Sequence, residues 1–250
     1  MATLTDGRDE ARRIIAEAEG RGLVLRLFGG LAVAVHSPSA GHRGLERSYL
    51  DLDFVSSERR GFRLEPFFAE LGYEANRAFN LYNGDRRLLF YDGAQQRQVD
   101  VFLGTFTMCH TIPIADRLAV EGITLPLAEL LLTKLQIVEM NEKDTRDVAA
   151  LLLDHPLGAT DAEAVNLPRL EALCGDDWGL WKTVSLSLDK VEQSIAALDL
   201  EPPARTTVLD RVGELRRALD GAPKTMRWRL RARVGERVRW YELPEEVRRG

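Results

Sequence analysis

The sequence predicts an α+β protein, with a small mixed β-sheet nucleus flanked by helices and followed by a helical C-terminal half. Strand-like segments and glycine turns alternate with helical segments up to about residue 125, whereas beyond Pro126 apolar residues recur at helical spacing and strand signals largely vanish. The 250 residues are 45% hydrophobic and 29% charged, which is typical of a soluble globular chain. We therefore expect one domain over residues 1–125 and a helical domain over residues 126–250 that ends in an arginine-rich tail.

The first half begins with an amphipathic segment that ends at Gly20 and predicts a helix over residues 8–20. Alternation of apolar and polar residues then predicts several strands. They are expected at residues 23–28, 49–55, 79–82, 87–91 and 97–103, with helices at residues 31–35 and 59–72. Turn signals stand at Asn83-Gly84-Asp85 and at Asp92-Gly93.

In the second half, apolar residues recur at the spacing typical of buried helices. The predicted helices cover residues 127–140, 144–153, 161–174, 180–199 and 203–220, with a break at Pro202-Pro203. In the tail, arginines alternate with apolar residues from Arg227 to Val234, which predicts a strand pair that turns at Gly235-Glu236 and has one basic face. A helix is the other interpretation of this segment.

The charge distribution bears on possible partners. The net charge of −5 argues against a protein that coats nucleic acid, yet residues 224–250 hold nine basic and four acidic residues. This basic tail either binds RNA phosphates or pairs with the acidic remainder of the chain. Two cysteines cannot form a disulfide framework, no Cys/His spacing fits zinc, and neither a secretory leader nor a membrane span is visible. A cytoplasmic location, without membrane contact, is the expectation.

Candidate functional residues lie at two places in the first half. Gly29-Gly30 stands at a strand-to-helix junction, where residues without Cβ let a phosphate approach backbone N–H groups. Asp51 and Asp53 are two residues apart on a strand, so their side chains share one face. Asp100 lies on a later strand and would complete a cluster of acids that a hard cation such as Mg²⁺ neutralises.

These residues, in this order, resemble the polymerase β-like nucleotidyltransferase superfamily, although the family commonly has Gly-Ser where this chain has Gly29-Gly30. The resemblance implies a catalytic nucleotidyltransferase domain over residues 1–125 and two Mg²⁺ ions that serve an NTP co-substrate. Asp51 and Asp53 would bridge both ions. Asp100 would bind the second ion and help deprotonate an acceptor hydroxyl.

Residues of the second half are similar to the abortive-infection (AbiEii-like) type of nucleotidyltransferase toxin. Glu129 and Lys134 share one predicted helix, and Lys143, Asp144 and Asp147 open the next. The resemblance gives Lys134 a contact with the NTP triphosphate; the alternative is an apolar stem that covers the core while its ammonium reaches water. Asp144 and Asp147 are more simply helix-start residues.

The arrangement Arg47-x3-Asp51-x-Asp53 also resembles aminoglycoside and lincosamide nucleotidyltransferases. Arg43 and Arg47 would then contact the triphosphate or the acceptor, or else be solvated loop residues. The expected reaction transfers a nucleoside monophosphate from an NTP to an acceptor. That acceptor is either an RNA end, such as tRNA, in a toxin-like enzyme with a partner antitoxin protein, or a small polyhydroxyl antibiotic. A non-catalytic nucleotide- or RNA-binding module is the third possibility.

Overall fold

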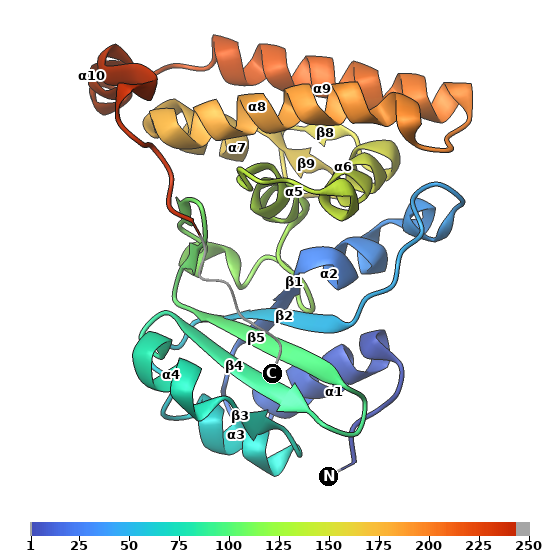
Figure 1. Cartoon of the computed structure of the whole chain (residues 1–250), viewed down its shortest axis with the longest axis vertical. Helices are drawn as coiled ribbons and strands as arrows, with labels where there is room; N and C mark the ends of the chain where they lie inside the picture. Colours follow the sequence, from blue (N-terminus) through green and yellow to red (C-terminus); the bar gives the residue numbers. More distant parts are fainter. Residues whose placement is uncertain (1, 244–250) are drawn as a thin grey trace.

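A five-stranded mixed sheet forms the centre of the first half of the computed structural model, which describes residues 2–243 (Figure 1). The strand order is β1-β2-β5-β4-β3, and only the β2–β5 pair within this sheet is parallel. The strands are β1 (Leu25–Phe28), β2 (Asp51–Ser56), β3 (Glu74–Ala75), β4 (Arg87–Asp92) and β5 (Arg97–Leu103). The predicted turn at Asp92-Gly93 joins β4 to its antiparallel neighbour β5, as that dipeptide favours.

Helices pack around this sheet. They are α1 (Gly7–Glu19), α2 (Gly29–His36), α3 (Leu64–Glu70) and α4 (Arg77–Asn83), with a short 3-10 turn at Pro38–Gly41. One sheet face is apolar: Leu52, Phe54 and Val99 are fully buried there, and Phe68 of α3 stacks on Phe90 of β4 with ring centroids 4.4 Å apart. Because side chains alternate along a strand, the opposite face of β2 and β5 carries the acids.

The second half is mainly helical, as predicted, and lies above the sheet in Figure 1. Its helices are α5 (Leu127–Leu135), α6 (Glu142–Asp154), α7 (Leu167–Asp176), α8 (Trp178–Ser194), α9 (Pro202–Gly221) and α10 (Met226–Val234). Two further pairs of two-residue strands lie beside them, β6 (Phe106–Thr107) with β7 (Thr111–Ile112) and β8 (Leu157–Gly158) with β9 (Val165–Asn166). No helix within residues 2–243 combines the length and apolar character needed to cross a bilayer.

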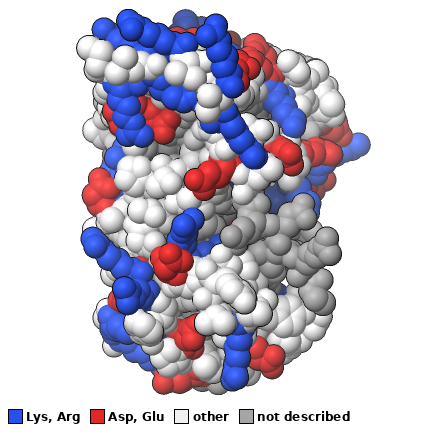
Figure 2. Space-filling view, turned by 60° about the vertical axis from the view of Figure 1, so that its left-hand side comes forward, with Lys and Arg blue, Asp and Glu red and all other residues white. Residues whose placement is uncertain are grey.

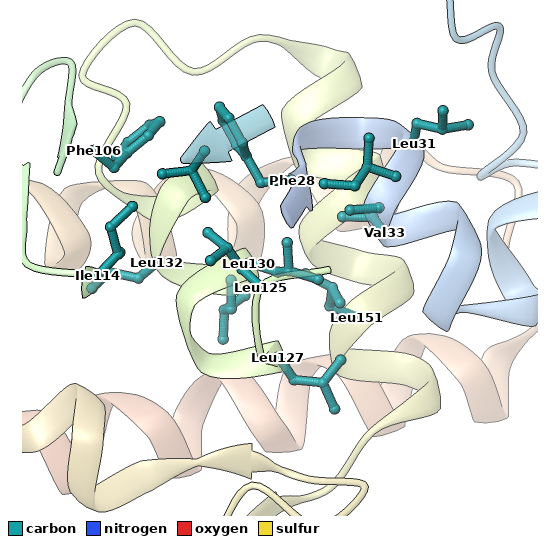
Figure 3. Packing of buried hydrophobic residues seen from close by; sticks show 14 of the residues in the cluster. Phe28, Leu31, Val33, Phe106, Ile114, Leu125, Leu127, Leu130, Leu132 and Leu151 are labelled. Atoms are coloured by element: carbon teal, nitrogen blue, oxygen red, sulfur yellow. The ribbon is translucent and has the colours of Figure 1, made fainter. Parts of the chain in front are cut away.

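A single hydrophobic cluster connects the two halves. It extends from Ala11 to Leu219, and Figure 3 shows Phe28 and Val33 of the first half beside Leu130 of the second. The backbone joins them as well, because the Leu27 N–H donates to the carbonyl of Ile123 at 2.8 Å and the Leu125 N–H donates to the carbonyl of Leu27 at 2.9 Å. Residues 123–125 thus run beside β1 immediately before α5 begins.

Two predicted elements are wrong. Residues 79–82 lie in helix α4 rather than a strand, because the Asn76 side chain caps this helix by accepting from the Phe79 N–H. The apolar residues that suggested a strand are largely in solvent, with Leu81 80% and Tyr82 83% exposed. Strand β3 was not predicted because a strand of two residues is too short to show alternation of apolar and polar residues.

The second wrong element is the strand pair in the tail. The segment from Met226 to Val234 is helix α10, whose first turn is capped by the Thr225 hydroxyl accepting from the Trp228 N–H. The helical alternative is therefore the one observed. Arg248 and Arg249, which belong to the predicted basic tail, lie outside the described residues.

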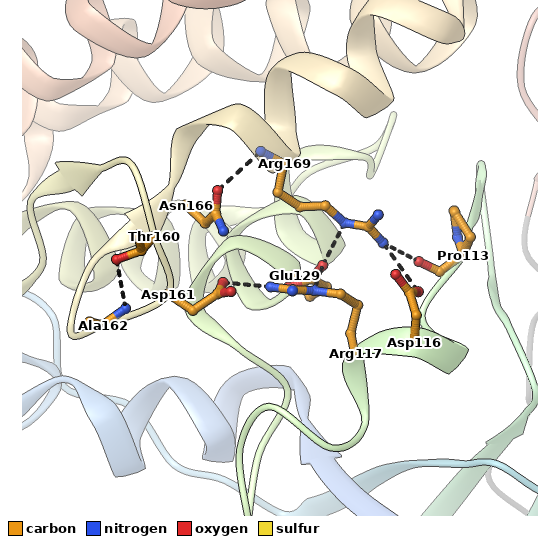
Figure 4. A network of polar contacts seen from close by, with 9 residues as sticks. All are labelled: Pro113, Asp116, Arg117, Glu129, Thr160, Asp161, Ala162, Asn166 and Arg169. Atoms are coloured by element: carbon orange, nitrogen blue, oxygen red, sulfur yellow. Dashed lines mark hydrogen bonds and ion pairs between the residues drawn. The ribbon is translucent and has the colours of Figure 1, made fainter.

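An ion-pair network fixes α5 against its surroundings (Figure 4). Glu129 is 1% exposed and accepts from Arg117 at 2.8 Å and from Arg169 of α7 at 2.9 Å. Arg117 also reaches Asp161, and Arg169 donates to the carbonyl of Pro113 at 2.5 Å. One buried carboxylate therefore joins the loop before α5, the loop before β9 and helix α7.

Removing this carboxylate leaves two partly buried guanidinium groups without their shared partner. We expect Glu129→Ala to lower the free energy of unfolding by about 3 kcal/mol, the typical cost of breaking a buried ion pair. Urea unfolding followed by circular dichroism measures this change. Glu214→Ala, on the exposed side of α9, is the matched control and should change stability by less than about 0.5 kcal/mol. Equal effects of the two variants would contradict a bracing role for Glu129.

Candidate functional site

Three acidic side chains meet on one face of the sheet. In the parallel pairing of β2 with β5, Asp53 lies opposite Asp100 and Asp51 lies opposite Gln98. Residues opposite each other on neighbouring strands point to the same side of the sheet, so Asp51, Asp53 and Asp100 share the face away from the apolar core. Leu52 and Val99 point the other way and are buried.

The electrostatics of Asp53 follow from this crowding. Burial, and then the neighbouring charge of Asp100, raise the pKa of Asp53 from 3.8 to about 7. The ammonium of Lys134 opposes this shift but does not cancel it, and Asp51 adds to it. Near neutral pH the site is therefore poised to lose a proton or to accept a cation.

Asp100 is held by two neighbours that the sequence did not reveal. Its Oδ1 accepts from Arg87 Nε at 2.7 Å and lies 2.6 Å from Arg87 Nη2, while its Oδ2 accepts from Gln98 at 2.8 Å. The Arg87 guanidinium also lies over the rings of Phe79 and Phe102, with its carbon 5.6 and 5.0 Å from their centroids. Arg87 stands on a predicted strand, but only the register of β4 against β5 brings it to Asp100.

The two glycines lie where the chain turns from β1 into α2. Gly29 has a φ of 72°, a conformation that favours glycine, and a Cβ at this position would overlap the Asp53 carboxylate. A Cβ at Gly30 would overlap the Arg47 guanidinium. No side chain within the described residues caps the first turn of α2, so its N–H groups have no side-chain acceptor there.

Lys134 and Arg47 share one carboxylate. Lys134 Nζ lies 3.0 Å from Asp144 Oδ1 and 2.9 Å from Asp147 Oδ2, and Arg47 Nε lies 2.9 Å from Asp147 Oδ1. Burial would lower the pKa of Lys134, but the carboxylates of Asp147 and Asp144 outweigh it and raise the pKa. Lys134 is only 9% exposed, so the interpretation of its ammonium as reaching water is wrong.

Helix α6 supplies these two acids in different ways. Asp144 closes a capping box with Asn141, which confirms its place at the start of the helix. Asp147 lies one turn further, is 2% exposed and holds Lys134 and Arg47, so the interpretation of Asp147 as a helix-start residue is wrong. Arg43 lies elsewhere, on the surface, where it forms an ion pair with Asp199 at 2.5 Å.

A small cavity of about 110 Å³ lies beside the acids. Its lining includes Gly30, Arg47, Asp51, Asp53 and Lys143. Backbone N–H groups, a guanidinium and carboxylates thus border the same space, which is the set of groups that a phosphate bound with a divalent cation needs.

The acids differ in how well their oxygens suit a metal ion. Asp51 and Asp53 offer the hard oxygen ligands that Mg²⁺ prefers. Both oxygens of Asp100, however, accept hydrogen bonds from Arg87 and Gln98. In this arrangement no group of three or more His, Cys, Asp or Glu side chains within residues 2–243 is placed to hold a metal ion. The donors of Asp51 and Asp53 fit a divalent cation, and Asp100 would join them only by exchanging Arg87.

Comparison with known proteins adds a likeness of fold. No family model matches the sequence, and no curated protein matches it. Among solved structures, the chain is similar to the solution structure of the antibiotic-resistance factor ANT(2'')-Ia, with a TM-score of 0.42 and 16% identity over 68% of this chain and 96% of that one. Likeness at this level supports no conclusion about function, which must come from the residues themselves.

The raised pKa of Asp53 has a measurable effect on stability. Because folding raises this pKa from 3.8 to about 7, the stabilisation of the protonated carboxyl is complete below about pH 4 and is lost as pH rises to about 7. We expect Asp53→Asn, which removes the titrating charge, to raise the Tm at pH 8 by at least about 2 °C, with a smaller gain at pH 5.

Differential scanning calorimetry of both proteins without divalent cations measures this difference. The matched control is Asp85→Asn. The Asp85 side chain is 72% exposed, so this substitution should leave the Tm unchanged at both pH 5 and pH 8. The same pH dependence in Asp53→Asn and in the unaltered protein would show that Asp53 does not carry a raised pKa.

Proposed function

We propose that the protein is a Mg²⁺-dependent nucleotidyltransferase that transfers a nucleoside monophosphate from an NTP to an acceptor hydroxyl. The observation that carries this proposal is the register of β2 against β5, which sets Asp53 opposite Asp100, with Asp53 next to Gly29 at the turn into α2. Carboxylates suited to cations therefore lie beside a helix start suited to phosphate.

Each residue has a role in this proposal. The N–H groups of Gly29 and Gly30 receive a phosphate of the NTP, and Arg47 and Lys134 hold its negative charge. Asp51 and Asp53 would hold the divalent cations, which would supply charge neutralisation at the reacting phosphate. Asp100 accepts the proton of the acceptor hydroxyl, after exchange of its bond with Arg87.

The proposed reaction balances without any further reactant. The acceptor oxygen forms a bond to the α-phosphorus, the bond between the α-phosphorus and the bridging oxygen breaks, and pyrophosphate leaves. The hydroxyl proton passes to a carboxylate. Lys134 and Arg47 give up part of their pairing with Asp147 when the triphosphate arrives, because phosphate oxygens compete for the same donors.

Two acceptors remain within the proposal. The basic helix α10 favours an RNA end, in which case the protein would act as a toxin-like enzyme in the cytoplasm with a partner antitoxin. The acidic net charge of −5 suits a cationic polyhydroxyl antibiotic instead. A non-catalytic nucleotide-binding module is the alternative that the pairing of Asp100 with Arg87 favours, since that pairing keeps a carboxylate away from metal.

The proposed roles of Asp51 and Asp53 are tested by measuring nucleotidyl transfer. The purified protein is incubated with each α-³²P-labelled NTP and Mg²⁺, with total tRNA and an aminoglycoside panel offered separately. We expect label on one acceptor and a loss of at least about 1,000-fold in Asp51→Asn and Asp53→Asn, since charge stabilisation at the reacting phosphate supplies several kcal/mol. Label transfer that survives in both variants would remove the proposed metal site. Mg²⁺-dependent NTP binding without any transfer would support the non-catalytic alternative.

Lys134 is tested by the apparent KM for NTP. Lys134→Met keeps the apolar stem in the core and removes the charge, so we expect KM to rise about tenfold while kcat changes little, as for loss of one ground-state contact. Arg12→Ala, on the exposed side of α1, serves as the control and should leave KM unchanged. An unchanged KM in Lys134→Met would restrict Lys134 to its ion pairs with Asp144 and Asp147.

A further inference from the structure

A cavity of about 540 Å³ at the end of the helical half combines charged groups with aromatic rings. Residues 107–111, the start of α8, helix α10 and the segment 239–242 line it. We propose that this cavity binds an unpaired nucleotide of a single-stranded polynucleotide and so holds the acceptor strand. The role as acceptor site rests on the proposed function, whereas the binding does not.

The cavity is held in shape by the chain's own contacts. The Glu242 N–H donates to the carbonyl of Cys109 at 3.0 Å, and Trp240 Nε1 donates to the Thr183 hydroxyl at 3.1 Å. Arg231 donates to the carbonyls of Gly235 and Val238 at 2.7 and 2.8 Å, which fastens the segment after α10 to the helix. A formed cavity of this size suits a nucleotide, because ligand sites generally measure a few hundred to 1,000 Å³.

Aromatic rings supply surfaces on which a base can stack. Trp178 and Trp240 meet edge to face at 6.0 Å, and Trp240 meets Tyr241 in the same way at 5.3 Å. Trp240 and Tyr241 are partly exposed at the cavity. Stacking of bases on such rings is the usual source of affinity for single strands and is closed to bases that are paired in a duplex.

The charged lining matches a nucleotide better than a simple anion or a cation. The lining holds guanidinium groups that can donate hydrogen bonds and carboxylates that can accept them, those of Arg227, Arg231 and Arg239 and of Asp176, Asp177 and Glu242. A base edge carries both donors and acceptors, and a phosphate binds guanidinium groups.

Further basic side chains lie outside the cavity, along α10. Figure 2 shows Lys and Arg gathered at the top of this face, where α10 lies. Arg229, Arg233 and Arg237 form no ion pair with any residue in the range 2–243. A polynucleotide backbone that leaves the cavity in this direction therefore passes cations whose charge is not already neutralised.

A second, smaller cavity adjoins this site. It measures about 110 Å³ and shares Thr107, Met108 and Glu242 with the larger one. Its lining also includes Arg87, whose Nη2 lies 2.6 Å from Asp100 Oδ1. A strand anchored in the large cavity can thus extend toward Asp100, and its arrival offers Arg87 a phosphate in place of that carboxylate.

Binding is measured without turnover, by fluorescence anisotropy of labelled 12-nucleotide RNA and DNA single strands and of an RNA duplex, with Asp53→Asn protein and no NTP. We expect either or both single strands to bind and the duplex to bind at least about tenfold more weakly. The double variant Arg227→Ala/Arg239→Ala should weaken single-strand binding about tenfold and flatten its salt dependence. Arg12→Ala/Arg59→Ala, an equal change of charge on the exposed surface of the first half, is the control.

The aromatic contribution is tested at Tyr241. Tyr241→Ala should weaken binding about tenfold, whereas Tyr241→Phe, which keeps the ring, should stay within about twofold. The RNA and DNA arms tell which sugar the site accepts. Equal loss in the Arg12/Arg59 control, tight binding of the duplex, or no single-strand binding would each overturn the proposal. Because no transfer is measured, this result is independent of the labelling experiment: strand binding without transfer would contradict the proposed function alone.

Discussion

The parallel register of β2 against β5 is the constraint on which the site depends, because it fixes two carboxylates, Asp53 and Asp100, opposite each other on one sheet face. Like charges at that position are unfavourable, and burial together with the neighbouring charge of Asp100 raises the pKa of Asp53. Three neighbouring residues accommodate the negative charge of these carboxylates. Arg87 pairs with Asp100 from the neighbouring strand, Lys134 approaches from α5, and Gly29 leaves room for the carboxylate against the turn.

Helix α5 links this charge balance to the stability of the helical half. Every residue from Leu127 to Leu135 is buried, including the two charged ones, Glu129 and Lys134. Glu129 joins the helix to α7 through Arg169, and Lys134 joins it to α6 through Asp147. Buried charges of this kind are tolerated only when paired, so the helix can occupy one position relative to both neighbours. That position sets where the Lys134 ammonium lies relative to Asp53.

Much of the sheet could be predicted from the sequence, and so could the face on which its acids lie. Polar and apolar residues alternate around the acids of β2 and β5, so the face that Asp51, Asp53 and Asp100 share could be inferred from the local pattern. The ion-pair partners could not be inferred from the sequence. Arg87 lies beside Asp100 because β4 and β5 are neighbours in the sheet, and Asp147 lies beside Lys134 because α5 packs against α6. At residues 79–82 and in α10, a single capping side chain, Asn76 or Thr225, outweighed the local alternation.

The hydrogen bonds between residues 123–125 and Leu27 determine how the molecule can move. A hinge at Pro126 would have to detach this segment from β1 and separate the core that both halves share. The sheet and α5 are therefore joined by backbone hydrogen bonds and a shared core, which fix the backbone positions of the acids and of Lys134 relative to each other. Discrimination among ligands then depends on how well they fit a preformed space rather than on closure of one lobe over another. Adaptation is left to side chains whose ion pairs can be exchanged, such as Arg87 and Arg47.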